Sequence, residues 1–82
     1  MILVDVYVAA VDKEYNFSLN ENISVRTIED EIIEMIEQKE QTTLAGNREA
    51  MTLCDRKSAR VLPGDHTLRE CGIMTGSSML LV

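Results

Sequence analysis

Two runs near the start of the chain alternate apolar and polar residues, and this period-two pattern is the strongest constraint on the fold. Alternation with β-branched residues on one side is typical of strands that bury one face. The apolar positions are Ile2, Val4, Val6, Val8, Tyr15, Phe17 and Leu19. Polar residues around 12–14 separate the two runs. The pattern therefore predicts a hairpin with the valine face pointing inward.

A stretch with apolar residues at helical spacing follows the hairpin. The spacing predicts an amphipathic helix that begins at Ile28, with Thr27 as its N-cap and Asp30 completing a variant of the capping box. Acidic residues at 29–31 would then lie at the positive N-terminal end of the helix dipole. Polar residues at 38–43 end the helix. The predicted apolar stripe consists of Ile28, Ile32, Met35 and Ile36.

Shorter strands are predicted in the second half of the chain. Residues 51–54 read as a third strand after a loop at Gly46-Asn47, and residues 61–62 as a short edge strand before a Pro-Gly-Asp turn. The last sixteen residues predict a tight turn and a final strand. Four further core positions are Leu68, Ile73, Met79 and Leu81. The element order favours an α+β fold with one helix packed on a mixed sheet, and residues 1–82 as a single domain.

Size and charge restrict the function. A chain of 82 residues builds a thin core, which leaves little room for a deep catalytic pocket. Fourteen acidic residues against eight basic ones give a net charge of −6, which repels phosphate backbones, so no nucleic-acid partner is expected. The apolar N-terminal run lacks a basic leader and contains Asp5, and no stretch reaches the roughly twenty apolar residues of a membrane span. We therefore expect a soluble cytoplasmic protein with no direct membrane insertion.

The reactive residues do not form a recognisable catalytic or metal motif. Cys54 and Cys71 lie outside any CxxC or Cys/His cluster, so reduced thiols are expected, with Cys71 packed as a small apolar group. His66 has no second histidine nearby, and Ser77 and Ser78 lack a nucleophile elbow. We expect no enzyme activity, no catalytic residue, no metal and no cofactor.

Strand alternation predicts one apolar surface. If Met79 and Leu81 point inward, the alternate residues of the last strand point outward, beside outward residues of adjoining strands. The candidate partner-binding residues are Tyr7, Thr52, Cys54, Leu80 and Val82. Contiguous exposed apolar patches tend to mark interaction sites, although scattered surface apolar residues are ordinary. The acidic helix face and the basic residues are interpreted as solvated surfaces, with docking of a charged partner as the alternative. Those basic residues are Arg48, Arg56, Lys57 and Arg60.

Short stretches carry a resemblance to known families. The element order, together with residues 27–29 (TIE) opening the helix and 67–68 (TL) before the last strand, resembles ubiquitin and its β-grasp fold. Residues 68–76 (LRECGIMTG) and 80–82 (LLV) resemble the YukD/EsaB family, small ubiquitin-like accessory proteins of bacterial type VII secretion systems. The same turn resembles the cytosolic domain of EccD-type membrane subunits, whose membrane segments have no counterpart here.

The resemblance implies a non-conjugated ubiquitin-like adaptor that binds protein subunits of the secretion apparatus. Its expected location is the cytoplasm, with recruitment to the inner face of the membrane by a protein partner; a weak homodimer is left open. The alternative is a ubiquitin-like modifier or sulfur carrier whose glycine tail is absent from this sequence. Both need a flexible C-terminal glycine, whereas Val82 is branched and ends the predicted strand. A third class is a regulatory protein that affects gene expression through protein contacts.

Overall fold

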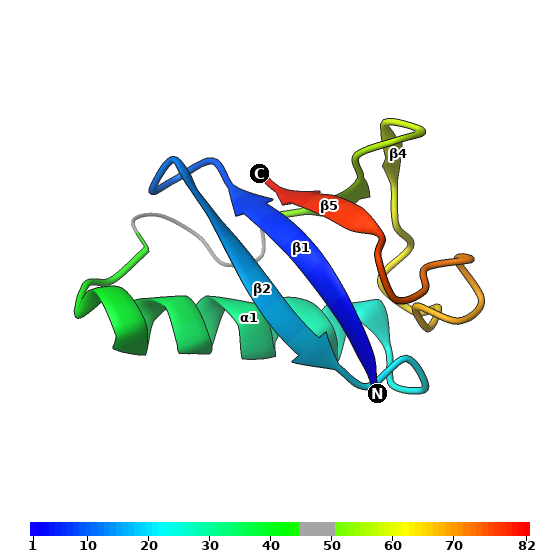
Figure 1. The fold of residues 1–82 in the computed structure, drawn as a ribbon. Helices are drawn as coiled ribbons and strands as arrows, with labels where there is room; N and C mark the ends of the chain where they lie inside the picture. The colour runs from blue at the N-terminus through cyan, green and yellow to red at the C-terminus, as the bar shows by residue number, and fades with distance from the viewer. Residues whose placement is uncertain (45–50) are drawn as a thin grey trace.

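A computed structural model describes residues 1–44 and 51–82, which form a five-stranded sheet with one helix across one face (Figure 1). The strand order is β2-β1-β5-β3-β4, with β1 and β5 parallel and the other neighbours antiparallel. The elements are β1 (Ile2–Val8), β2 (Lys13–Leu19), α1 (Val25–Glu40), β3 (Leu53–Asp55), β4 (Arg60–Val61) and β5 (Ser78–Leu81). The predicted mixed sheet with one packed helix is therefore confirmed.

The N-terminal hairpin has the predicted inner face. Its register pairs Ile2 with Leu19 and Val8 with Lys13, so the apolar side chains of both strands gather against the helix. Val6 and Val8 are fully buried. The turn differs from the prediction, because β2 already begins at Lys13. Asp12 adopts a positive φ of 51°, a conformation that Asp tolerates, and the chain reverses before Lys13.

The predicted helix start was wrong by one turn. α1 begins at Val25, and its N-cap is Ser24, whose hydroxyl accepts a hydrogen bond from the Thr27 amide (3.3 Å). No acidic residue lies in the first turn. The Val25 amide donates to the His66 carbonyl (2.7 Å) and the Arg26 amide to the Gly64 carbonyl (3.0 Å). A loop about forty residues away in sequence thus satisfies amides that helix termini leave unpaired, which allows the earlier start.

The buried stripe of the helix also differs from the prediction at one position. Met35 is 40% exposed, whereas Ile33, which the prediction omitted, is fully buried. Ile33 widens the stripe that faces the sheet, and Met35 lies on its flank. The buried helical residues are Val25, Ile28, Ile32, Ile33 and Ile36. The helix ends at Glu40 within the predicted range, with Gln41 in the left-handed conformation.

The short strands of the second half lie close to their predicted positions. β3 spans Leu53–Asp55 instead of the predicted 51–54, and β4 spans Arg60–Val61 instead of 61–62, because Leu62 turns into the core. The Leu62 amide nevertheless donates to the Leu53 carbonyl (2.9 Å), which continues the pairing beyond the strand. All four predicted core positions of the C-terminal segment are buried, namely Leu68, Ile73, Met79 and Leu81. Gly46, Asn47 and Arg48 lie outside the described residues.

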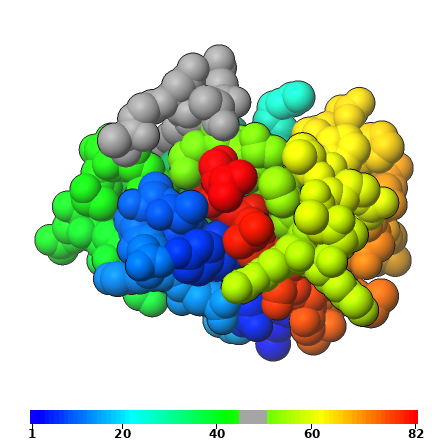
Figure 2. All heavy atoms as spheres, turned by 90° about the horizontal axis from the view of Figure 1, so that it is seen from above, coloured from blue at the N-terminus to red at the C-terminus, as the bar shows by residue number. Residues whose placement is uncertain are grey.

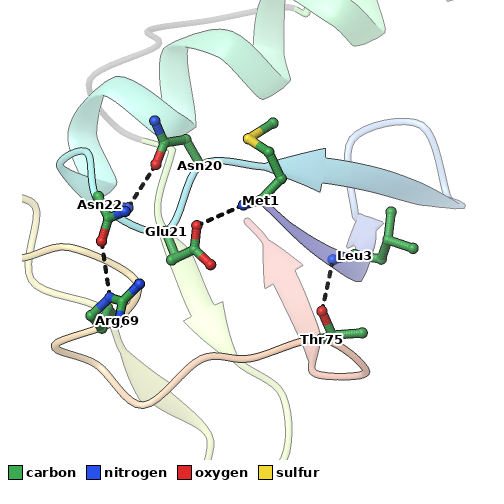
Figure 3. A network of polar contacts seen from close by, with 7 residues as sticks. All are labelled: Met1, Leu3, Asn20, Glu21, Asn22, Arg69 and Thr75. Carbon is green, nitrogen blue, oxygen red and sulfur yellow. Dashed lines mark hydrogen bonds and ion pairs between the residues drawn. The ribbon is translucent and has the colours of Figure 1, made fainter.

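The turn at 68–76 is held by contacts with the start of the chain and with the β2–α1 loop (Figure 3). Thr75 Oγ1 accepts a hydrogen bond from the Leu3 amide (3.3 Å), and Arg69 Nε donates to Asn22 Oδ1 (2.9 Å). Gly72 and Gly76 adopt φ values of 78° and 94°, which other residues adopt only with strain. The turn that carries the family resemblance therefore also connects β1 to the β2–α1 loop.

Glu29 anchors the start of β3 from the helix. Its Oε2 accepts a hydrogen bond from the Leu53 amide (2.9 Å). Burial raises the pKa of the Glu29 carboxyl, while the Leu53 amide acts in the opposite direction. The ionised form is therefore less favourable in the folded protein than in the unfolded chain. The contribution of Glu29 to stability is complete below the unfolded pKa of about 4.3 and declines as the pH rises through the folded pKa.

We expect Glu29→Gln to stabilise the protein at pH 7, because glutamine removes the buried charge and keeps an oxygen that can accept from the Leu53 amide. The gain should shrink toward pH 4, where Glu29 itself is protonated. Urea unfolding of both proteins at the two pH values measures the difference. Glu31→Gln, at an exposed position on the same helix, controls for the loss of one helix charge. A destabilised Glu29→Gln variant at pH 7 would contradict the prediction.

Candidate partner-binding surface

Four strands contribute one residue each to a row across the face of the sheet opposite the helix. The register pairs Tyr7 of β1 with Leu80 of β5, Leu80 with Cys54 of β3, and Cys54 with Val61 of β4. The neighbours Val6 and Leu81 point toward the helix and are fully buried, so by strand alternation the row faces outward. Figure 2 shows this face, where β1, β5 and the β3–β4 segment lie side by side.

The chain beyond β5 extends the same face. The Thr52 amide donates to the Val82 carbonyl (2.6 Å), and the Val82 amide donates to the Thr52 carbonyl (3.0 Å). Val82 is 51% exposed and Val61 57% exposed, while the other members are half-buried. We call this surface the outer patch; it consists of Tyr7, Thr52, Cys54, Val61, Leu80 and Val82.

The structure brings all five predicted binding residues together on the outer patch and adds Val61. Sequence reasoning missed Val61 because a two-residue strand is too short to show alternation. The structure identifies Val61 through its pairing with Cys54, which places both side chains on one face. Whether these residues bind a partner stays a prediction.

A polar rim borders the outer patch at Tyr7. The Arg56 guanidinium lies 5.7 Å from the centre of the Tyr7 ring and 3.1 Å from Glu14 Oε2, so the side chain reaches from the end of β3 across β5 and β1 to β2. The Tyr7 hydroxyl donates to the Asp12 carboxylate, and this hydrogen bond, with burial, raises the pKa of Tyr7. The rim therefore places a cation and two carboxylates beside apolar surface, as at the edges of many protein interfaces.

The basic segment is partly engaged by the protein itself. Besides the contacts of Arg56, the Arg60 guanidinium donates to the Cys71 carbonyl (3.1 Å). These contacts favour the interpretation of both arginines as structural surface residues. On the helix, Asp30, Glu31 and Glu34 are exposed.

Cys71 and Ser77 have structural roles in this protein. Cys71 packs against the core, and burial raises the pKa of its thiol, which keeps the thiol protonated. Ser77 Oγ accepts a hydrogen bond from the Met74 amide (3.1 Å) within the turn. In residues 1–44 and 51–82, no three His, Cys, Asp or Glu side chains gather in a way that could hold a metal ion.

A family comparison decides the assignment. The family model described as "WXG100 protein secretion system (Wss), protein YukD" matches residues 3–81. The chain belongs to the YukD family. This YukD-family protein is therefore a component of a WXG100, or type VII, secretion system. Curated protein sequences gave no match.

Solved structures confirm the ubiquitin-like β-grasp. A chain of the MycP5-free ESX-5 inner membrane complex is similar to this YukD-family protein with a TM-score of 0.81 and 17% identity, over 99% of this chain and 20% of that chain. Caldiarchaeum subterraneum ubiquitin has a TM-score of 0.73 and 15% identity, over 98% and 89% of the two chains. The ubiquitin-like domain of Arabidopsis thaliana protein At2g32350 has a TM-score of 0.73 and 21% identity, over 99% and 74%. At these identities the likeness establishes the fold alone.

The helix of this YukD-family protein is unsuited to crossing a membrane. Within the described parts of the chain, no helix combines the length and the apolar character that a membrane span requires.

Proposed function

We propose that this YukD-family protein is a non-conjugated adaptor that binds a protein subunit of the secretion apparatus through the outer patch. It acts by binding and not by catalysis, as one ubiquitin-like domain in the cytoplasm. Its partner recruits it to the inner face of the membrane. The observation that carries the proposal is the row of Tyr7, Leu80, Cys54 and Val61 across four strands.

The composition and rigidity of the outer patch support protein binding. Tyrosine and arginine are enriched among residues that dominate binding energy, and Tyr7 lies in contact range of Arg56. The aliphatic members Val61, Leu80 and Val82 supply apolar area, which contributes about 25 cal/mol per Å² when it is removed from water. Because these residues lie on or beside paired strands, binding requires little ordering of the backbone.

Backbone pairing gives the end of β5 a fixed position in the outer patch. Both backbone groups that join Val82 to Thr52 are engaged, so the residues up to Val82 are held in the sheet. The Val82 side chain is therefore presented to a partner without further ordering of the backbone.

The similar fold within the ESX-5 inner membrane complex supports the nature of the partner. That match spans one fifth of a longer chain in a secretion membrane complex. A β-grasp of this size is therefore compatible with docking against such machinery. The identity of 17% restricts this support to the fold.

Affinity capture from the source cell, with intact-mass analysis of the captured bait, tests the proposal. An N-terminal tag leaves the C-terminal end available for processing. We expect bait of unmodified mass together with subunits of the secretion apparatus. Bait that is glycine-terminated, thiolated or covalently attached to other proteins would replace the adaptor with a modifier or carrier.

A further inference from the structure

Among residues 1–44 and 51–82, β2 is an edge strand with β1 as its only neighbour in the sheet (Figure 1). The Asp5 amide donates to the Ser77 carbonyl and the Ala9 amide to the Leu81 carbonyl, so the odd-numbered residues of β1 direct their backbone groups toward β5. The even-numbered residues of β1 then face β2 and pair with residues 13, 15, 17 and 19. By alternation, Glu14, Asn16 and Ser18 direct their amides and carbonyls away from the sheet.

These edge-facing backbone groups have no hydrogen-bond partner among residues 1–44 and 51–82. An edge of this kind is a template for pairing with another strand, and proteins commonly block it with charged side chains, proline, a bulge or a covering segment. The charged residues of β2, Lys13 and Glu14, lie at one end of the strand and are paired within the chain with Glu40 and Arg56. β2 contains no proline, and its register with β1 is unbroken over seven residues. The backbone of β2 is therefore competent to accept a further strand.

We propose that β2 pairs antiparallel with β2 of a second copy of this chain, about a two-fold axis through Asn16. In this register Asn16 lies opposite Asn16 of the second copy, and Glu14 lies opposite Ser18 of the second copy. Each of these edge-facing pairs exchanges two backbone hydrogen bonds, about six in all. A two-fold interface of this kind joins two identical strands into one continuous ten-stranded sheet.

Side-chain chemistry selects this register. A pairing centred on Glu14 would place two carboxylates directly opposite each other, which is unfavourable, and would leave edge-facing groups of Ser18 unpaired. Centring on Asn16 avoids like charges and pairs every edge-facing residue. On the helix side, Tyr15 would lie opposite Phe17 of the second copy. This contact extends the Tyr15–Phe17 aromatic pair already present, whose ring centres are 5.9 Å apart.

Charge predicts the salt dependence of the dimer. Each chain carries a net charge of −6, so the two copies repel each other. Salt screens such repulsion, with a Debye length of about 10 Å at 0.1 M and about 3 Å at 1 M. The dimer should therefore strengthen as the ionic strength rises.

Sedimentation equilibrium of the full chain, from micromolar to millimolar concentration at low and high salt, tests the proposal. Asn16→Pro removes an edge-facing amide and the side-chain hydrogen bond to Asp5 but no backbone hydrogen bond to β1, and it should raise the dissociation constant of the dimer at least about tenfold. Asn16→Ala is the matched control, because it removes the side-chain hydrogen bond to Asp5 and keeps the edge amide. It should stay within about threefold of the unmodified protein. Circular dichroism of both variants verifies the fold.

Disulfide trapping tests the register. In a background of Cys54→Ser and Cys71→Ala, Asn16→Cys would place two thiols across the two-fold axis, with Cα atoms about 5.5 Å apart and within disulfide range. We expect it to form a covalent dimer much faster than Glu14→Cys, whose thiols would be four positions out of register. A monomer at every concentration, equal cross-linking of the two variants, or self-association unaffected by Asn16→Pro would each overturn the proposal. Because Asn16 lies outside the outer patch, none of these outcomes bears on capture of an apparatus subunit.

Discussion

Replacing Ile32 with alanine is expected to lower the free energy of unfolding by about 2 to 5 kcal/mol. Ile32 is fully buried in the middle of α1, within the cluster that joins the helix to the sheet. Truncation loses the transfer free energy of the removed atoms and leaves a cavity that the surrounding side chains only partly fill. Domains are stable by only about 5 to 15 kcal/mol, so this is a large share of the total. Urea unfolding followed by circular dichroism measures the loss.

Met35→Ala is the matched control for Ile32→Ala. Met35 lies three residues further along the same helix but is 40% exposed. Its truncation should cost less than about 1 kcal/mol, since little new cavity forms. Equal losses for the two variants would mean that the helix meets the sheet through a different face, with Met35 in the core as its spacing in the sequence suggested.

The elements that could be predicted from the sequence are those whose pattern is local. The valines of β1 and the aromatic residues of β2 alternate over enough positions to identify the inner face without knowledge of the rest of the chain. The turn signals at 63–65 and 72–76, together with alternation in the last strand, predicted the core positions Leu68, Ile73, Met79 and Leu81.

The start of the helix could not be read locally. Thr27 followed by Asp30 fits a capping pattern, yet Ser24 is the cap because the carbonyls of Gly64 and His66 accept hydrogen bonds from the first helical amides. Met35 has helical spacing to its neighbours, but the side of α1 that faces the sheet buries Val25 and Ile33 and leaves Met35 exposed. Both differences arise from tertiary contacts that outweigh local preference.

The outer patch could be predicted from local sequence patterns, whereas its polar rim could not. Alternation along β1, β3 and β5 correctly predicted that the five residues lie on one face of the sheet. Their role in binding is still a prediction. The rim could not be predicted, because Arg56 and Glu14 are 42 positions apart in sequence. Their contact depends on β1 lying between β2 and β5, and therefore on the order of strands in the sheet.

Leu80→Asp is expected to weaken binding of the captured apparatus subunit at least about tenfold. Leu80 lies between Tyr7 and Cys54 at the centre of the outer patch, so a carboxylate there would be buried without a partner at the interface. Its half-exposed, outward position allows the monomer to fold with the charge in water. Titration of the purified subunit by calorimetry measures the affinity, and circular dichroism verifies the fold.

Leu3→Asp is the control for Leu80→Asp, because it makes the same replacement at an exposed position of β1 on the same face of the sheet, outside both the outer patch and the edge of β2. If general repulsion by the added charge caused the loss, both variants would weaken binding equally. If the outer patch makes the contact, Leu3→Asp should bind within about threefold of the unmodified protein. Unchanged affinity of a folded Leu80→Asp variant would place the contact elsewhere, and the exposed acidic face of α1 would then be the next surface to test.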